Sequence, residues 1–76
     1  MIFNYSKLKG RIVEKLGSNK KLAELIGLSE HSLSLKINNQ VEFRQSEIFK
    51  ICEVLDIDSN TIKDYFFECN VQSNWT

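Results

Sequence analysis

Apolar residues recur along the chain at the three- and four-residue spacing of an amphipathic helix, in five separate segments. Short polar gaps that contain helix-capping residues separate these segments. The alternation typical of a strand is weak, apart from the short "QVEF" connection and "CNVQSNW" near the end. The pattern therefore predicts an all-α fold, a compact bundle of five short helices at residues 5–16, 18–27, 29–38, 44–55 and 58–67.

Each predicted helix has an apolar face and recognisable ends. Ser18 and Ser29 are suited to cap the first free amides of the second and third helices, and Gly17 and Gly27 to end the first and second. The predicted inward residues are Tyr5, Leu8, Ile12 and Leu16; Leu22, Leu25 and Ile26; Leu33 and Ile37; Ile48, Ile51, Cys52 and Leu55, followed by Ile57; and Ile62, Tyr65 and Phe66.

The link between the second and third helices is only "GLS", residues 27–29. It is too short for antiparallel helices and too long for one continuous helix, so a right-angled helix-turn-helix is expected. Ala23 allows the two helices to approach, Gly27 supplies permissive turn backbone, and Leu28 fills the corner.

The third helix carries a distinctive outward face. On a helical wheel of about 100° per residue with Leu33 and Ile37 inward, the most outward positions are His31, Leu35 and Asn38. Their side chains suit DNA base edges, because asparagine can bond adenine, histidine guanine, and leucine a thymine methyl. In the alternative interpretation, Leu35 belongs to the core of a rotated helix or faces a second chain. The predicted base-contacting residues are His31, Ser32, Ser34, Leu35 and Asn38.

The stretch "NKKLAELIGLSEHSLSLKINN" resembles the lambda-repressor-like helix-turn-helix family (Cro and CI-type, XRE), and specifically small phage-type regulators. Five residues occupy the places expected in that family: Ala23, Gly27, Leu28, Ser29 and Leu33. Because "EIFKICEVLDID" looks like the family's fourth helix and its exit, the resemblance covers about residues 5–66. It departs from many relatives at Ile37, which is buried one place later than usual. The resemblance implies that the third helix enters the DNA major groove.

Phosphate contacts are expected beside this helix. The start of the second helix combines free amides, a favourable dipole and two lysines, and the loop before the fourth helix could hold the opposite strand. Alternatively, the lysines are simply solvated and Arg44 pairs with Glu42 or Glu47. The predicted phosphate-contacting residues are Ser18, Asn19, Lys20, Lys21, Lys36, Asn39 and Arg44.

Charge and composition narrow the possible functions. The 76 residues carry zero net charge, but residues 1–36 sum to +4 and residues 37–76 to −4. With a single histidine, two distant cysteines and no glycine-rich loop, neither a hydrolytic triad nor a zinc or nucleotide site has its usual spacing. We therefore expect no enzyme, metal or cofactor. No apolar run approaches a membrane span and no secretory signal is present, so a cytoplasmic or nucleoid location is expected.

Two functional hypotheses follow. In the first, residues 1–67 form a DNA-binding domain of a Cro-like phage or prophage repressor. It binds a palindromic operator as a homodimer, because one recognition helix reads few base pairs. The tail, residues 68–76, then contributes to a dimer interface formed by Phe67, Val71 and Trp75. In the alternative, the protein is a protein-binding modulator, an antirepressor or corepressor, that pairs with another phage repressor.

Overall fold

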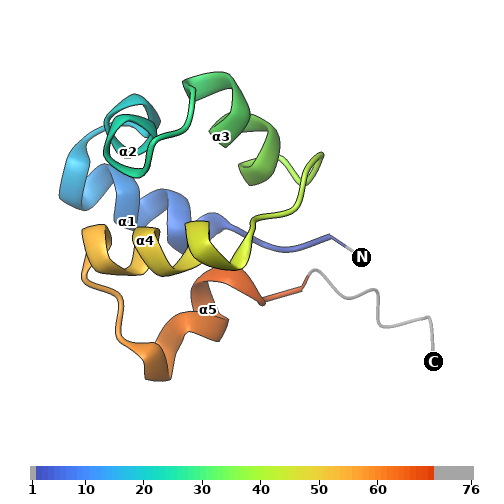
Figure 1. The fold of residues 1–76 in the computed structure, drawn as a ribbon. Coiled ribbons are helices and arrows are strands. Elements are labelled where there is room, and N and C mark those ends of the chain that lie inside the picture. The colour runs from blue at the N-terminus through green and yellow to red at the C-terminus, as the bar shows by residue number, and fades with distance from the viewer. Residues whose placement is uncertain (1, 70–76) are drawn as a thin grey trace.

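The computed structural model describes residues 2–69, and these residues form a helical bundle (Figure 1). Its elements are α1 (Ser6–Leu16), α2 (Asn19–Ile26), α3 (Glu30–Ile37), α4 (Gln45–Leu55), the short 3-10 helix η1 (Ser59–Thr61) and α5 (Ile62–Phe66). The predicted all-α class is confirmed. Between residues 2 and 69, β-type pairing is limited to an isolated antiparallel bridge between Phe3 and Cys69. No helix in this range is long and apolar enough to cross a membrane.

The predicted caps are present at the starts of α2 and α3 and at the end of α2. The Ser18 hydroxyl accepts the Lys21 backbone N–H at 3.3 Å, and the Ser29 hydroxyl accepts the Ser32 N–H at 3.0 Å at the start of α3. Gly27 ends α2 at φ 79°, in the left-handed region that favours glycine. Its position lets the chain turn at once into α3, and Figure 1 shows α2 almost end-on while α3 runs across the view. The two helices therefore cross steeply, as a helix-turn-helix requires.

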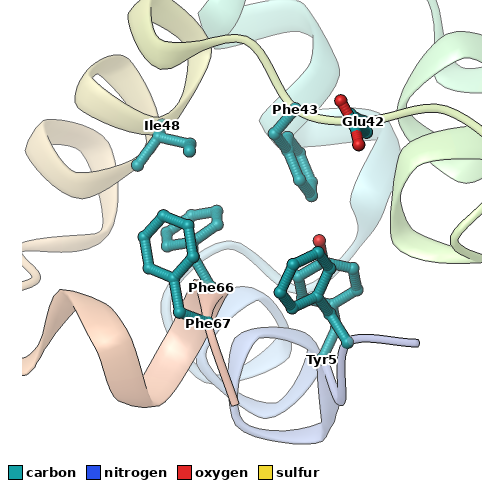
Figure 2. Close-up of a pocket in the computed structure, with 7 residues that line it drawn as sticks. Tyr5, Glu42, Phe43, Ile48, Phe66 and Phe67 are labelled. Atoms are coloured by element: carbon teal, nitrogen blue, oxygen red, sulfur yellow. The ribbon is translucent and has the colours of Figure 1, made fainter. Parts of the chain in front are cut away.

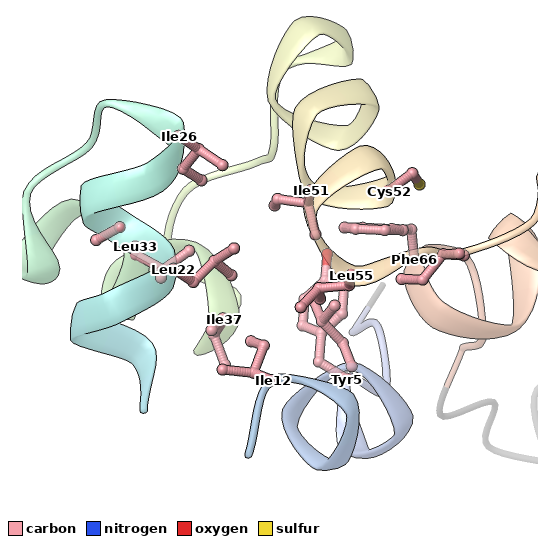
Figure 3. Packing of buried hydrophobic residues seen from close by; sticks show 13 residues of the cluster. Tyr5, Ile12, Leu22, Ile26, Leu33, Ile37, Ile51, Cys52, Leu55 and Phe66 are labelled. Atoms are coloured by element: carbon pink, nitrogen blue, oxygen red, sulfur yellow. The ribbon is translucent and has the colours of Figure 1, made fainter. Parts of the chain in front are cut away.

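The core joins all five α-helices into one buried cluster, which Figure 3 shows from close by. Its residues are Tyr5, Leu8, Ile12, Leu22, Ala23, Ile26, Leu33, Ile37, Ile51, Cys52, Leu55, Ile57 and Phe66. Most of these are the residues that the helical pattern placed inward. α2 packs against α1, α3 and α4, so the helix-turn-helix is built onto the rest of the bundle.

Leu25 is an exception, because 50% of it is exposed although the spacing predicts it inward. Ala23 shares the buried face of α2 with Leu22 and Ile26, which moves the centre of that face about 105° away from Leu25 on a helical wheel. The expected fifth helix also differs. Its first turn is the 3-10 helix η1, because the Asp58 carboxylate and carbonyl accept hydrogen bonds from the backbone N–H groups of Asn60 and Thr61.

The N-terminal segment is fixed between two distant parts of the chain. The Asn4 N–H donates to the Glu68 carbonyl at 2.6 Å, beside the Phe3–Cys69 bridge. On the other side, the Asn39 side chain accepts the Phe3 N–H and donates to the Phe3 carbonyl, both at 2.9 Å. Residues 2–5 therefore connect the loop after α3 to the end of α5, an arrangement that helical periodicity does not reveal.

Substituting Asn39 tests this connection. Asn39 has a positive φ of 66°, which asparagine tolerates better than most residues. We expect Asn39→Ala to lower the free energy of unfolding by about 2 kcal/mol, through two lost hydrogen bonds and the strained backbone. Asn39→Gly loses the same hydrogen bonds but keeps the backbone conformation, and should therefore recover about half of that loss. Urea unfolding measures both variants, and equal stability of wild type and Asn39→Ala would contradict the prediction.

Candidate functional site

The outward face of α3 is less open than the helical wheel predicts. His31 and Asn38 are exposed, but Leu35 is only half-buried instead of pointing fully into solvent. The chain turns at the end of α3, where the backbone N–H groups of Gln40 and Val41 both donate to the Leu35 carbonyl. Leu35 therefore lies where the chain leaves the helix, and a helical wheel does not include this turn.

Several polar groups of this face bond to one another. The Ser32 hydroxyl pairs with the Ser29 hydroxyl at 3.0 Å, and the Asn38 amide donates to the Ser34 hydroxyl at 3.3 Å. Ser32, Ser34 and Asn38, together with His31 and Leu35, make up the base-contacting set predicted from the sequence. The structure places this set on α3 and its C-terminal end. The hydroxyls of Ser32 and Ser34 and the amide of Asn38 already take part in hydrogen bonds with neighbouring residues of the same segment.

The residues predicted to contact phosphate are dispersed, and three of them, Ser18, Asn39 and Lys36, make contacts within the protein. Lys20 and Lys21 are exposed at the start of α2, next to the capping Ser18, and Arg44 is exposed at the start of α4. Asn19 is half-buried. Asn39 instead bonds both backbone groups of Phe3, and Lys36 is buried.

Lys36 forms an internal ion pair instead of extending outward. Its Nζ lies 3.0 Å from Glu47 Oε1 and donates to the Glu42 carbonyl at 3.1 Å, while only 7% of the residue is exposed. The same Glu47 oxygen accepts the Arg44 N–H at 2.8 Å. The prediction that Lys36 reaches a phosphate is therefore wrong, because its ammonium is used to hold the loop between α3 and α4.

Beside this loop the structure forms an open hollow of about 210 Å³, which we call the aromatic groove (Figure 2). Its lining residues are Phe3, Tyr5, Glu42, Phe43, Ile48, Phe66 and Phe67. They come from the N-terminal segment, the loop before α4, α4 itself and the end of α5. Figure 2 shows Phe43 and Ile48 on one side of the opening and Tyr5, Phe66 and Phe67 on the other. The rings form a continuous series of edge-to-face and tilted contacts, with centroids 5.4–6.2 Å apart.

The aromatic groove continues past Phe3 and Tyr5 into a second hollow of about 260 Å³, which is lined also by residues 39–42. Two large apolar residues that line these hollows stay exposed. Phe67, in the aromatic groove, is 53% exposed, and Val41, in the second hollow, is 46% exposed. Aromatic side chains that remain accessible around a concave surface are typical of protein-binding sites. The arrangement can therefore bind an apolar side chain or segment of a partner.

The sequence interpretation found only part of this surface. Phe67 was predicted to lie at an interface and is in the groove, whereas Val71 and Trp75 lie outside the described residues. Phe3 and Phe43 were not recognised, because they belong to connecting segments instead of helical faces. Large aromatic residues outside any helical stripe are the signal that could have identified them.

Tyr5 and Glu42 give this groove an electrostatic signature. Burial raises the pKa of Tyr5 above its ordinary value of about 10, and the negative charges of Glu42 and Cys69 raise it further. We expect Glu42→Gln to lower the pKa of Tyr5 but to leave it above the ordinary value, because burial remains. An NMR titration of the Tyr5 ring carbon measures this pKa, with Glu53→Gln as the control. No change in Glu42→Gln would contradict the prediction.

Comparisons with known proteins identify the family. The family model described as "Protein of unknown function (DUF739)" matches residues 1–69. The chain belongs to the DUF739 family. This DUF739 protein is also similar to a solved structure, the solution structure of the modulator of repression (MOR) of the temperate bacteriophage TP901-1 from Lactococcus lactis. The two are 42% identical, the match covers 88% of this chain and 90% of that chain, and the TM-score is 0.77. A comparison with curated proteins gave no match.

These findings correct the predicted identity of the DUF739 protein. The assignment to the lambda-repressor-like Cro/CI-type (XRE) family is wrong, and so is the leading prediction of a DNA-binding Cro-like repressor, because the similarity is to a modulator of repression. The physical reason is that Ala23, Gly27, Leu28 and Leu33 specify how two helices pack at a turn. That packing does not specify what the outer surface binds.

Proposed function

We propose that this DUF739 protein is a phage modulator of repression that binds a phage repressor protein and changes its action on DNA. The observation that carries the proposal is the 42% identity to the TP901-1 modulator over 90% of that chain. At this level of identity and coverage, the similarity extends well beyond the helix-turn-helix segment. The protein then acts without catalysis, in the cytoplasm where the repressor meets its operator.

The aromatic groove supports this proposal as the surface for the repressor. It combines a concave shape, aromatic walls and exposed apolar edges, and Glu42 is the single charged residue among those that line the main hollow. Such a surface offers little to a phosphate backbone, which requires cations, but it can bury apolar groups of a protein.

A gel-shift titration tests the function directly. The labelled operator is saturated with the repressor of the phage that carries this gene, and the purified DUF739 protein is then added. We expect the band of the repressor–operator complex to be released or further retarded, while the DUF739 protein alone leaves the operator unshifted. An unchanged band together with no co-elution of the two proteins in gel filtration would overturn the proposal. A sequence-specific shift by the DUF739 protein alone would also overturn it.

A further inference from the structure

A separate hollow lies on α4, η1 and the start of α5, and shares no lining residue with the aromatic groove or its continuation. We call it the acidic groove, and its volume is about 300 Å³. It is lined by Phe49, Cys52, Glu53, Asp56, Ile57, Ser59 and Ile62. Nothing in the proposed binding of a repressor at the aromatic groove uses this surface.

The acidic groove has an apolar floor and an unusually exposed aromatic edge. Cys52 and Ile57 are buried beneath it, and Ile62 is half-buried. Phe49 is 64% exposed, the largest fraction for any large apolar residue between residues 2 and 69. Exposure of a phenylalanine beside a hollow with an apolar floor leaves apolar area in water that a partner could cover.

The two charged residues that line this hollow are both negative. Glu53 and Asp56 follow Phe49 at i+4 and i+7, so the three residues form one stripe along α4 and its end. No cation is among the lining residues. Within the described chain the ion pairs are Arg11–Glu14 and Lys36–Glu47, so neither Glu53 nor Asp56 is neutralised by a salt bridge.

Three cations lie near these carboxylates, and none of them forms a salt bridge with Glu53 or Asp56 within residues 2–69. Lys50 and Lys63 are exposed and are not among the lining residues. Arg11 donates to the backbone carbonyl oxygens of Leu55 and Asp56, at 2.9 and 3.0 Å. Its guanidinium therefore bonds the free carbonyl groups at the end of α4 instead of the Glu53 and Asp56 carboxylates. The Asp58 carboxylate, next to the hollow, accepts the Asn60 N–H. The rim therefore presents negative charge to an incoming ligand.

We propose that the acidic groove is a second docking site, which takes a cationic amphipathic segment of a partner protein. An apolar side chain of that segment packs on Phe49 and the floor, and lysine or arginine residues on either side of it pair with Glu53 and Asp56. Nucleic acid and anionic lipid surfaces are excluded by the same charge, because they would bring phosphates against unpaired carboxylates. The inference does not depend on which protein occupies the aromatic groove.

The test uses the full chain, labelled with ¹⁵N, and a synthetic helical peptide with leucines on one face and lysines on the other. A matched peptide carries glutamate in place of every lysine. In amide shift titrations at physiological salt, we expect the lysine peptide to shift residues 49, 53, 56 and 62, and the glutamate peptide to cause no shifts there. Shifts centred on Phe3 and Phe67, or equal binding of both peptides, would overturn the proposal.

Variants then connect the binding to the named residues. We expect Glu53→Lys/Asp56→Lys, and separately Phe49→Ser, to weaken binding of the lysine peptide by roughly tenfold or more. Glu24→Lys/Glu30→Lys changes the net charge by the same amount on exposed positions of α2 and α3, and should change the affinity less than twofold. An equal loss in this control would mean that binding follows net charge alone. Phe49→Ser alters an exposed side chain, so it keeps the proposal testable even if the double variant unfolds. The peptide titrations contain no repressor. A negative result in them would therefore overturn the acidic groove as a docking site without affecting the gel-shift test of the proposed function.

Discussion

Replacing Lys36 with methionine is expected to lower the free energy of unfolding by about 3–5 kcal/mol, because it leaves the Glu47 carboxylate buried without its cation. This loss is a large part of the roughly 4–11 kcal/mol expected for a domain of this size. Methionine is similar in length to lysine and keeps the packing, so the loss reports on the charge and its hydrogen bonds. Urea unfolding followed by circular dichroism measures it.

A double variant provides the control. Glu47→Gln keeps an oxygen that can accept the Arg44 N–H, but it removes the negative charge. Lys36→Met/Glu47→Gln should therefore recover most of the stability lost in Lys36→Met, since no unpaired charge stays buried. If Lys36→Met alone were as stable as wild type, the ion pair would not hold the loop between α3 and α4.

The same pair makes stability depend on pH in a defined direction. Burial by itself raises the pKa of Glu47. The hydrogen bonds from Arg44 and Lys36 and their positive charges outweigh it, so that the pKa lies below its ordinary value. The stabilisation is therefore complete above the unfolded-state pKa of about 4.3 and is lost as the pH falls through the lower folded-state pKa. The stability difference between wild type and Glu47→Gln should shrink over this acidic range, and parallel pH profiles would contradict the assignment.

Replacing Phe67 with serine is expected to weaken binding of the phage repressor by roughly tenfold or more, because aromatic residues at the edge of a binding hollow dominate such interfaces. Phe67 is 53% exposed and lies edge-to-face with Phe3, at a centroid distance of 6.2 Å. Its loss therefore removes contact area for a partner with little cost to the core. Isothermal titration calorimetry of the full chain with the repressor measures the affinity.

Val13→Ser is the matched control for this experiment. Val13 is 63% exposed on α1 and lines neither the aromatic nor the acidic groove. It should leave the affinity for the repressor within about twofold, since a scattered exposed apolar residue contributes little. Equal losses of affinity in Phe67→Ser and Val13→Ser, or no loss in either, would mean that the repressor does not bind at the aromatic groove. Phe49→Ser, tested beside them, separates the two grooves.

Local sequence signals predicted most of the helices and their ends. Ser18 and Ser29 cap helices as expected, because a hydroxyl that accepts an amide of the next turn is a short-range interaction. Gly27 turns the chain for an equally local reason, its positive φ. Leu25 shows the limit of the pattern, since the small Ala23 determines which side of α2 faces its neighbours.

The candidate site was less predictable because it is assembled from distant segments. The aromatic groove needs Phe3, Phe43 and Phe67 in one place, and helical periodicity contains no information about where connecting segments lie. Lys36 was expected to reach a phosphate. Its direction depends on Glu47, eleven positions along the chain and on another helix.

The sequence by itself determined an all-α bundle, its caps and the helix-turn-helix, since these follow from helical spacing and from interactions within a few residues. Only the tertiary structure decided which outer surfaces can bind a partner. Asn39 bonds Phe3 across 36 positions, and Asn4 bonds the Glu68 carbonyl beyond the end of α5. These long-range contacts place Phe3 beside residues 42–43 and 66–67, where the aromatic groove forms. The physical reason is that core packing constrains inward residues strongly, whereas function depends on the outward ones.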